Sequence, residues 1–224
     1  SLTTPMATCN GAKVGIPGEE PLFLRTLSRP AVATVMELET RHNLYVNYYL
    51  DSSVYCAHDS PLREWYAKHY SLNVNLLPLE KIAALGLPMK CLSIVETGEH
   101  APVSRLFASA LGDQAKLTAS NDRFIEILPP EADKAEGVRQ LSLWSGIPLA
   151  DFVAVGDGLN DLPMLEAAGF SITFNSGDPR LAEHADMVLP PLWEDGMDML
   201  AKVVLGLTES GRFLTRRSNR LFRK

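Results

Sequence analysis

The sequence is poor in cysteine and has no long apolar run. Only three of its 224 residues are cysteines, and these lie far apart without a C-x-x-C pair: Cys9, Cys56 and Cys91. This pattern excludes a disulfide scaffold and a cysteine-rich zinc site, and it predicts free thiols in a reducing compartment. No stretch approaches the roughly 20 apolar residues that span a bilayer, so no membrane partner is expected. We expect a cytoplasmic protein, or one of an organelle stroma if a transit peptide has been removed.

Acidic residues are also missing from the carboxyl-terminal end of the sequence. The chain is 46% hydrophobic and 21% charged, as is typical of a globular protein of one or two domains, and its net charge is −6. Residues Arg212 to Lys224, however, contain six cations and no acid. We interpret this tail as a solvated helix end, so a nucleic-acid partner is not expected. Binding of nucleic acid or an anionic surface by the tail is the alternative.

The most informative stretch is residues 152–161, with the sequence FVAVGDGLND. Four apolar residues predict a parallel strand that is buried on both faces. Gly156 and Gly158 allow a sharp turn and a close approach of the backbone to a ligand. In open α/β sheets ligands bind at the carboxyl ends of the strands, where Asp157 falls, and a hard cation such as Mg²⁺ requires carboxylate oxygens there.

A helix is expected directly after this turn. Asn160 or Asp161 can cap its first turn, and Pro163 is tolerated near its start. Gly169 can end it. The pattern is therefore strand, tight acidic turn and helix.

This stretch resembles the fourth motif of the haloacid dehalogenase superfamily, and more narrowly that of the Cof-type phosphatases. Further fragments resemble family motifs in the family's order: the "NGA" strand (residues 8–14), the "leI-P" strand and lysine motif (124–137), the next core strand (171–175), the helix end after it (183–186) and the "edGv" turn (194–197). The resemblance implies an α/β fold with a Rossmann-like core, in which helices cover both faces of a parallel sheet. It also implies an inserted α/β cap, with residues 1–24 and 129–224 in the core and residues 25–128 in the cap.

Hydrophobic spacing within residues 25–128 predicts alternating helices and strands. Helices are expected at residues 30–40, 61–70 and 102–111. Strands are expected at residues 44–50, 53–57, 90–95, 116–118 and 123–128. This order is similar to that of the large cap of the Cof group.

The resemblance implies roles for four residues. Asp157 matches the Mg²⁺-binding carboxylate, Lys134 and Asp161 match catalytic residues, and Lys134 and Asn160 match groups that bind the phosphoryl oxygens. Simpler interpretations are a helix-cap aspartate for Asp157, a first-turn acid for Asp161 and a surface cation for Lys134. For Asn160, capping explains the residue about as well as phosphate binding does.

One departure from the family concerns the nucleophile. The family begins with D-x-D-G-T on its first strand, where the first aspartate attacks phosphorus, and a serine or threonine motif follows; neither is present here. The missing unit is explained by a truncated chain, by a separate chain that supplies it, or by a protein that has reorganised and lost catalysis. Since those strands lie in the middle of the family's sheet, the strands near Asn10 and Val153 would face a gap.

Two functions follow from these observations. The first is a Mg²⁺-dependent phosphatase that hydrolyses a small phosphomonoester, either a sugar phosphate or a phosphorylated cofactor, through an aspartyl phosphate once the missing unit is present. The 224-residue chain alone is then expected to be inactive. The second is a binding or scaffold protein that has lost its nucleophile and binds metal without turnover.

Overall fold

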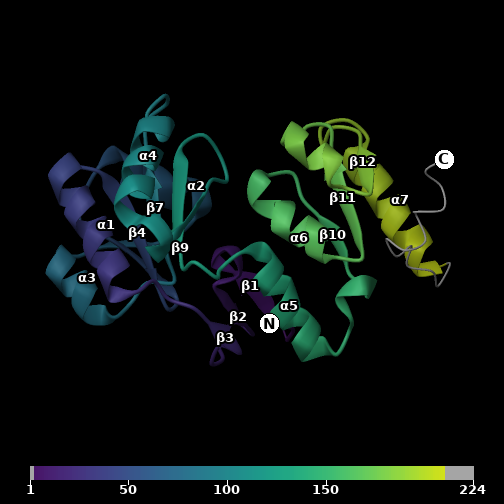
Figure 1. Ribbon diagram of the computed structural model, residues 1–224, viewed down its shortest axis with the longest axis horizontal. Helices are drawn as coiled ribbons and strands as arrows, with labels where there is room; N and C mark the ends of the chain where they lie inside the picture. Colours follow the sequence, from purple (N-terminus) through teal and green to yellow (C-terminus); the bar gives the residue numbers. More distant parts are fainter. Residues whose placement is uncertain (1–2, 210–224) are drawn as a thin grey trace.

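A computed structural model describes residues 3–209, whose strands form three sheets (Figure 1). The largest has six strands in the order β6-β5-β4-β7-β9-β8. Their bounds are β4 Tyr45–Leu50, β5 Ser53–Cys56, β6 Val74–Leu76, β7 Lys90–Ile94, β8 Lys116–Thr118 and β9 Phe124–Leu128. The basic tail from Arg212 to Lys224 lies outside the described residues.

Helices cover both faces of this six-stranded sheet. They are α1 Arg29–His42, α2 Pro61–Tyr70, α3 Leu79–Leu85 and α4 His100–Leu111. Side chains alternate along β4, so that Val46 and Tyr48 pack with α1, α3 and α4, whereas Tyr45 packs with α2 on the other face. The expected helices and strands of residues 25–128 are confirmed to within two residues at each end. The short β6 and α3 were not expected.

The amino-terminal sheet differs from the expectation. Residues 8–14 were expected to form one strand, but β1 Met6–Thr8 and β2 Lys13–Gly15 form an antiparallel hairpin that β3 Phe23–Leu24 extends. The turn contains Cys9, Asn10 and Gly11, which all have left-handed φ angles of 51°, 51° and 85°. Glycine and asparagine tolerate this conformation, so the Asn-Gly pair interrupts the strand that its apolar neighbours favour.

The third sheet is parallel and has the order β10-β11-β12. Its strands are β10 Val153–Val155, β11 Phe170–Phe174 and β12 Met187–Leu189, with α6 Leu162–Ala167 between the first two. Ala154 packs with α6 on one face, and Ile172 packs with α7, Gly196–Glu209, on the other. The expected α/β fold, a parallel sheet with helices on both faces, is confirmed.

Burial of β10 is lower than expected. All of β11 is buried, but in β10 only Ala154 is, and Val153 and Val155 are half-buried. The reason is its position: within residues 3–209, β10 has a strand partner on one side only.

The helix α5, Lys134–Ser145, follows β9 directly and lies between the amino-terminal hairpin and α6 (Figure 1). A Cβ atom on Gly11 would lie 2.0 Å from the carbonyl oxygen of Asp133, so the hairpin turn needs glycine to pack against the start of α5. No helix among residues 3–209 is long and apolar enough to cross a membrane.

Candidate functional site

The loop after β10 is shaped by the carboxylate of Asp161. Its Oδ2 atom accepts hydrogen bonds from the backbone N–H groups of Asp157, at 3.1 Å, and Gly158, at 3.0 Å. A Cβ atom on Gly156 would lie 2.4 Å from the Asp161 Cβ, which explains the glycine at that position. Asp161 is only 5% exposed. The buried carboxylate therefore folds the acidic turn back onto itself.

The expected caps of α6 are confirmed only in part. Asp161 is the N-cap residue of α6, but its side chain makes no capping hydrogen bond, because its carboxylate points back to the loop. The helix ends at Ala167, with Ala168 rather than Gly169 as its C-cap. Gly169 serves close packing instead, since a Cβ atom there would lie 1.7 Å from the carbonyl oxygen of Ala150.

Lys134 is the first residue of α5, and its Nζ atom forms an ion pair with Oδ1 of Asp161. A cation at a helix amino terminus opposes the helix dipole, so the buried carboxylate of Asp161 offsets an unfavourable position of Lys134. The N-cap of α5 is Asp133, which accepts a hydrogen bond from the N–H of Glu136 at 2.9 Å. Burial raises the pKa of Asp133, but the hydrogen bonds from Lys116 and this N–H outweigh it, and the pKa is lowered.

Asn160 contacts a residue that sequence reasoning did not select. Its Nδ2 atom donates to Oδ1 of Asn10 at 3.3 Å, and Asn10 in turn donates to the carboxylate of Glu126. Asn10 and Glu126 belong to fragments that resemble the family, the "NGA" and "leI-P" strands. Their hydrogen bond joins residues 116 positions apart, so no local sequence pattern predicts it.

Asp157 has the free carboxylate of the loop. Its side chain is exposed and accepts no hydrogen bond from any residue in the range 3–209. The carboxylate of the neighbouring Asp178 pairs with Arg180, whose hydrogen bonds lower the pKa of Asp178 to about 2. The backbone N–H of Asp178 donates to the carbonyl oxygen of Asp157 at 2.8 Å.

The donor set fits one carboxylate ligand to Mg²⁺. The described residues contain no group of three or more histidine, cysteine, aspartate or glutamate side chains that could hold a metal ion. Mg²⁺ is usually held by one or two carboxylates, with waters and substrate phosphates as its other ligands. Asp157 can be such a carboxylate, whereas Asp161 is occupied by Lys134 and two N–H groups.

Two cavities border this loop and share three lining residues from β8 and the loop: Leu117, Thr118 and Leu159. One of about 380 Å³ lies between Asp157 and the β8–β9 hairpin, with Ser120 and Asn121 in its wall. The other, of about 140 Å³, is lined by Lys134, Asn160 and Asn10. Three of the four predicted site residues, Asp157, Lys134 and Asn160, thus border two adjoining cavities, and Asp161 is buried behind them in contact with Lys134. The roles of all four remain predictions.

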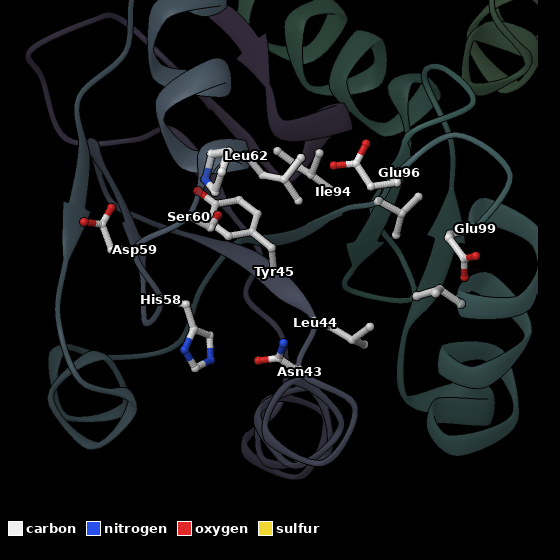
Figure 2. Close-up of a pocket in the computed structure, with 13 residues that line it drawn as sticks. Asn43, Leu44, Tyr45, His58, Asp59, Ser60, Leu62, Ile94, Glu96 and Glu99 are labelled. Atoms are coloured by element: carbon white, nitrogen blue, oxygen red, sulfur yellow. The ribbon is translucent and has the colours of Figure 1, made fainter.

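A larger cavity of about 490 Å³ lies elsewhere, among α1, α2, α4 and the six-stranded sheet (Figure 2). His58 and Asp59 lie on one side, and Glu96 and Glu99 lie on the other. Asp59 and Glu96 are paired with Arg63 and Arg123. None of the four predicted site residues lines this cavity.

Known proteins similar to this chain are consistent with the geometry. The family model described as haloacid dehalogenase-like hydrolase matches residues 1–199. The HMP-PP phosphatase of Cronobacter sakazakii is 28% identical over 191 residues, which cover 81% of this chain and 66% of that protein. The 5-amino-6-(5-phospho-D-ribitylamino)uracil phosphatase YitU of Bacillus subtilis is 25% identical over 213 residues, covering 92% and 78%.

A solved structure shows the same fold. That of a HAD/COF-like hydrolase from Plasmodium vivax superposes with a TM-score of 0.80 at 21% identity, covering 88% of this chain and 71% of that one. The present chain spans just under two thirds of the length of the Cronobacter phosphatase.

Proposed function

Because the chain belongs to the haloacid dehalogenase-like hydrolases, we propose that it carries the phosphate- and Mg²⁺-binding part of a phosphatase for small phosphomonoesters. The observation that carries this proposal is the Lys134–Asp161 ion pair beside the free carboxylate of Asp157, at the carboxyl end of β10. A cation and a free acid held together there suit an anionic substrate and a divalent metal.

Each residue has a distinct proposed role. Lys134 neutralises charge on the phosphoryl oxygens, and Asp161 is a catalytic residue that holds both this lysine and the loop. Asn160 donates its amide to a phosphate oxygen, and Asp157 is the metal ligand. When bound, Mg²⁺ would withdraw charge from the transferring phosphoryl group.

The nucleophile is proposed to lie outside these 224 residues, on a preceding segment or a second chain that carries D-x-D. Attack by that aspartate on phosphorus would expel the alcohol and leave an aspartyl phosphate, which water then hydrolyses to inorganic phosphate. We retain the division into a core of residues 1–24 and 129–224 and a cap of residues 25–128. The β8–β9 hairpin of the cap borders the 380 Å³ cavity beside Asp157 and can thereby exclude water and select the leaving group.

The relatives' names support the proposed substrate class. One relative is named for HMP-PP and another for a phosphorylated ribitylaminouracil. We propose a comparably small phosphorylated metabolite, either a sugar phosphate or a phosphorylated cofactor or its precursor. The polar wall of the 380 Å³ cavity, with Ser120, Asn121 and Arg180, suits a hydroxylated leaving group.

Substitution of Lys134 tests the proposal in the polypeptide as its natural source makes it. With 4-nitrophenyl phosphate and Mg²⁺, Lys134→Ala should lower kcat by about 100-fold or more, as loss of a group that stabilises transition-state charge does. Lys202→Ala, an exposed lysine of α7 that pairs with Asp198, is the matched control and should leave kcat unchanged. A change in KM alone would mean that Lys134 only binds substrate.

A non-catalytic binding or scaffold role is the second candidate, favoured by the absence of a D-x-D motif from these 224 residues. The intact mass and amino-terminal sequence of the natural polypeptide separate the two functions. A D-x-D segment in that polypeptide or in a tightly bound partner supports the phosphatase. Its absence from both supports the binding role.

A further inference from the structure

Asn10 connects the loop after β10 to the six-stranded sheet. Its backbone is held in the left-handed region, with φ 51° and ψ 40°, between β1 and β2. From there its Oδ1 atom accepts the amide of Asn160, and its Nδ2 atom donates to Glu126 on β9. The asparagine side chain therefore has both ends occupied, one by the loop and one by the sheet.

Glu126 is a buried carboxylate with three donors. It is 4% exposed, and its Oε2 atom faces Asn10 and the ammonium of Lys90, which lies 3.4 Å away. Its Oε1 atom accepts the hydroxyl of Ser120 at 2.7 Å. Lys90 also lies over the ring of Tyr49, 4.7 Å from its centroid, so the countercharge is fixed in place as well.

Two of the three partners of Glu126 belong to different parts of the proposed site. Ser120 lines the larger cavity beside Asp157, and Asn10 lines the smaller one beside Lys134. A single carboxylate on β9 thus orients one residue in the wall of each cavity. It does so from the strand that leads directly into α5 and Lys134.

We propose that Glu126 is a positioning residue for the phosphate site, which acts through Asn10 on the amide of Asn160 and through Ser120 on the hairpin. The expected effect on phosphate binding rests on the proposed function. The orientation of Asn10 and Asn160 can be measured without any ligand. Glu126 does not touch the reacting atoms. Its ionised form is an acceptor at both oxygens, which fixes the amide of Asn10 with its nitrogen toward β9 and its oxygen toward Asn160.

Replacement by glutamine disturbs this arrangement while keeping the size of the side chain. The amide of Glu126→Gln has one acceptor atom and one donor group, so it cannot accept from both Asn10 and Ser120 as the carboxylate does. Asn10 is then free to flip, which would turn its NH₂ group toward the NH₂ group of Asn160. We expect Asn160 to lose its fixed orientation.

The first test is NMR of the side-chain amides in the 224-residue chain without ligand. In Glu126→Gln the Asn160 amide protons should exchange with water about tenfold faster or more, because a charge-assisted network has been lost. Asn10→Gly keeps the left-handed turn and removes the link from its other end, so it should produce the same acceleration. The double variant should exchange no faster than Asn10→Gly alone, since Glu126 acts through Asn10.

Glu39→Gln is the matched control, because Glu39 is also a fully buried carboxylate of the region between residues 25 and 128 but contacts Tyr48 and His58. It should leave the Asn160 exchange rate unchanged. Unchanged exchange in both Glu126→Gln and Asn10→Gly would overturn the proposal. Equal acceleration by Glu39→Gln would do the same, because it would mean that the effect is not specific to Glu126.

The second test is binding of inorganic phosphate in the presence of Mg²⁺, measured by calorimetry. Glu126→Gln should weaken it about three- to tenfold relative to the unmodified chain and to Glu39→Gln, as a misoriented donor does. If the unmodified chain binds no phosphate, the proposed function fails, whereas the positioning role is still decided by the exchange rates. If phosphate binds equally well to Glu126→Gln, the positioning role is contradicted and the proposed function stands.

Discussion

At the scale of single residues, the two carboxylates of the motif loop have opposite surroundings. Asp161 is buried and accepts two backbone hydrogen bonds as well as the Lys134 ammonium, whereas Asp157 is exposed and accepts none from the described residues. Burial with full pairing makes a carboxylate a structural anchor. A free carboxylate at the end of a strand is available to a metal. The chemical type is the same, and only the folded environment separates the two proposed roles.

Glu39 provides a residue-scale prediction outside the site. Desolvation raises its pKa from 4.5 to about 7, despite the hydrogen bond from Tyr48. Between pH 4.5 and 7 the folded state therefore holds a proton that the unfolded state has released, and stability falls as the pH rises through this window. Glu39→Gln removes the effect. The variant should gain up to about 3 kcal/mol relative to the unmodified chain between pH 5 and pH 8.

Urea denaturation at several pH values measures this gain. Glu37→Gln on the same helix is the control, because the Glu37 side chain is 59% exposed and pairs with Arg41 at the surface. For Glu37→Gln, the free energy of unfolding plotted against pH should run parallel to that of the unmodified chain. If the Glu39→Gln profile is equally parallel, Glu39 is ionised in the folded state and the argument from desolvation is wrong.

Single residues could be predicted from the sequence only where a local pattern marked them. Asp157 stands directly after a strand and Lys134 at the start of a helix, and in the structure both contact Asp161. No local sequence pattern indicated a role for Glu126 or Asn10. Their hydrogen bond depends on the meeting of β9 with the amino-terminal turn, and spacing along the chain carries no information on that contact.

At the scale of elements, two helical glycines should respond oppositely to the same substitution. A Cβ atom on Gly206 in α7 would meet nothing within 4 Å, so Gly206→Ala should stabilise the protein by about 0.5–1 kcal/mol through helix propensity. A Cβ atom on Gly137 in α5 would lie 2.8 Å from the Ala7 Cβ and 3.2 Å from the Gly11 Cα. Gly137→Ala should therefore destabilise it by about 1–3 kcal/mol.

Thermal and urea unfolding of the two variants check this pair. Opposite signs mean that α5 is packed tightly against the amino-terminal hairpin, which positions Asn10 beside the site. Stabilisation by both substitutions would show that this contact is loose in solution, and the support it gives to Asn10 would have to be abandoned.

Periodicity predicted the elements and their ends better than their burial. The α2 helix begins at Pro61 and ends at Tyr70, as its amphipathic spacing indicated. The strand β10 has the apolar composition of a fully buried strand, yet it is half-buried, because burial depends on neighbouring strands rather than on composition. The turn at Asn10 was missed because left-handed residues interrupt a run that otherwise favours a strand.

At the scale of the whole molecule, the proposed site is assembled from segments that are far apart in the sequence. The turn at Asn10, the β8–β9 hairpin, the start of α5 and the loop after β10 border the two adjoining cavities. Because these segments come from different sheets, the site depends on how the sheets meet. The family resemblance supplied that arrangement, whereas composition and spacing alone could not.

A whole-molecule prediction concerns turnover by the isolated chain. The 224 residues contain no D-x-D-G-T nucleophile motif, so the chain alone should hydrolyse 4-nitrophenyl phosphate no faster than buffer with Mg²⁺. Addition of a polypeptide that carries the proposed D-x-D strand should restore activity. Magnesium-dependent turnover by the isolated chain would place the nucleophile within it, and the proposed source of the aspartate would then be wrong.

The central claim, that the loop after β10 holds the metal of a phosphatase, is tested most directly by Asp157→Asn in the natural-length protein. Hydrolysis of 4-nitrophenyl phosphate is measured against Mg²⁺ concentration, with circular dichroism to monitor the fold. We expect the variant to keep its fold and to lose about 100-fold or more of the Mg²⁺-dependent rate, because the exposed carboxylate is the proposed metal ligand. A variant whose rate and Mg²⁺ dependence match those of the unmodified protein would contradict the account.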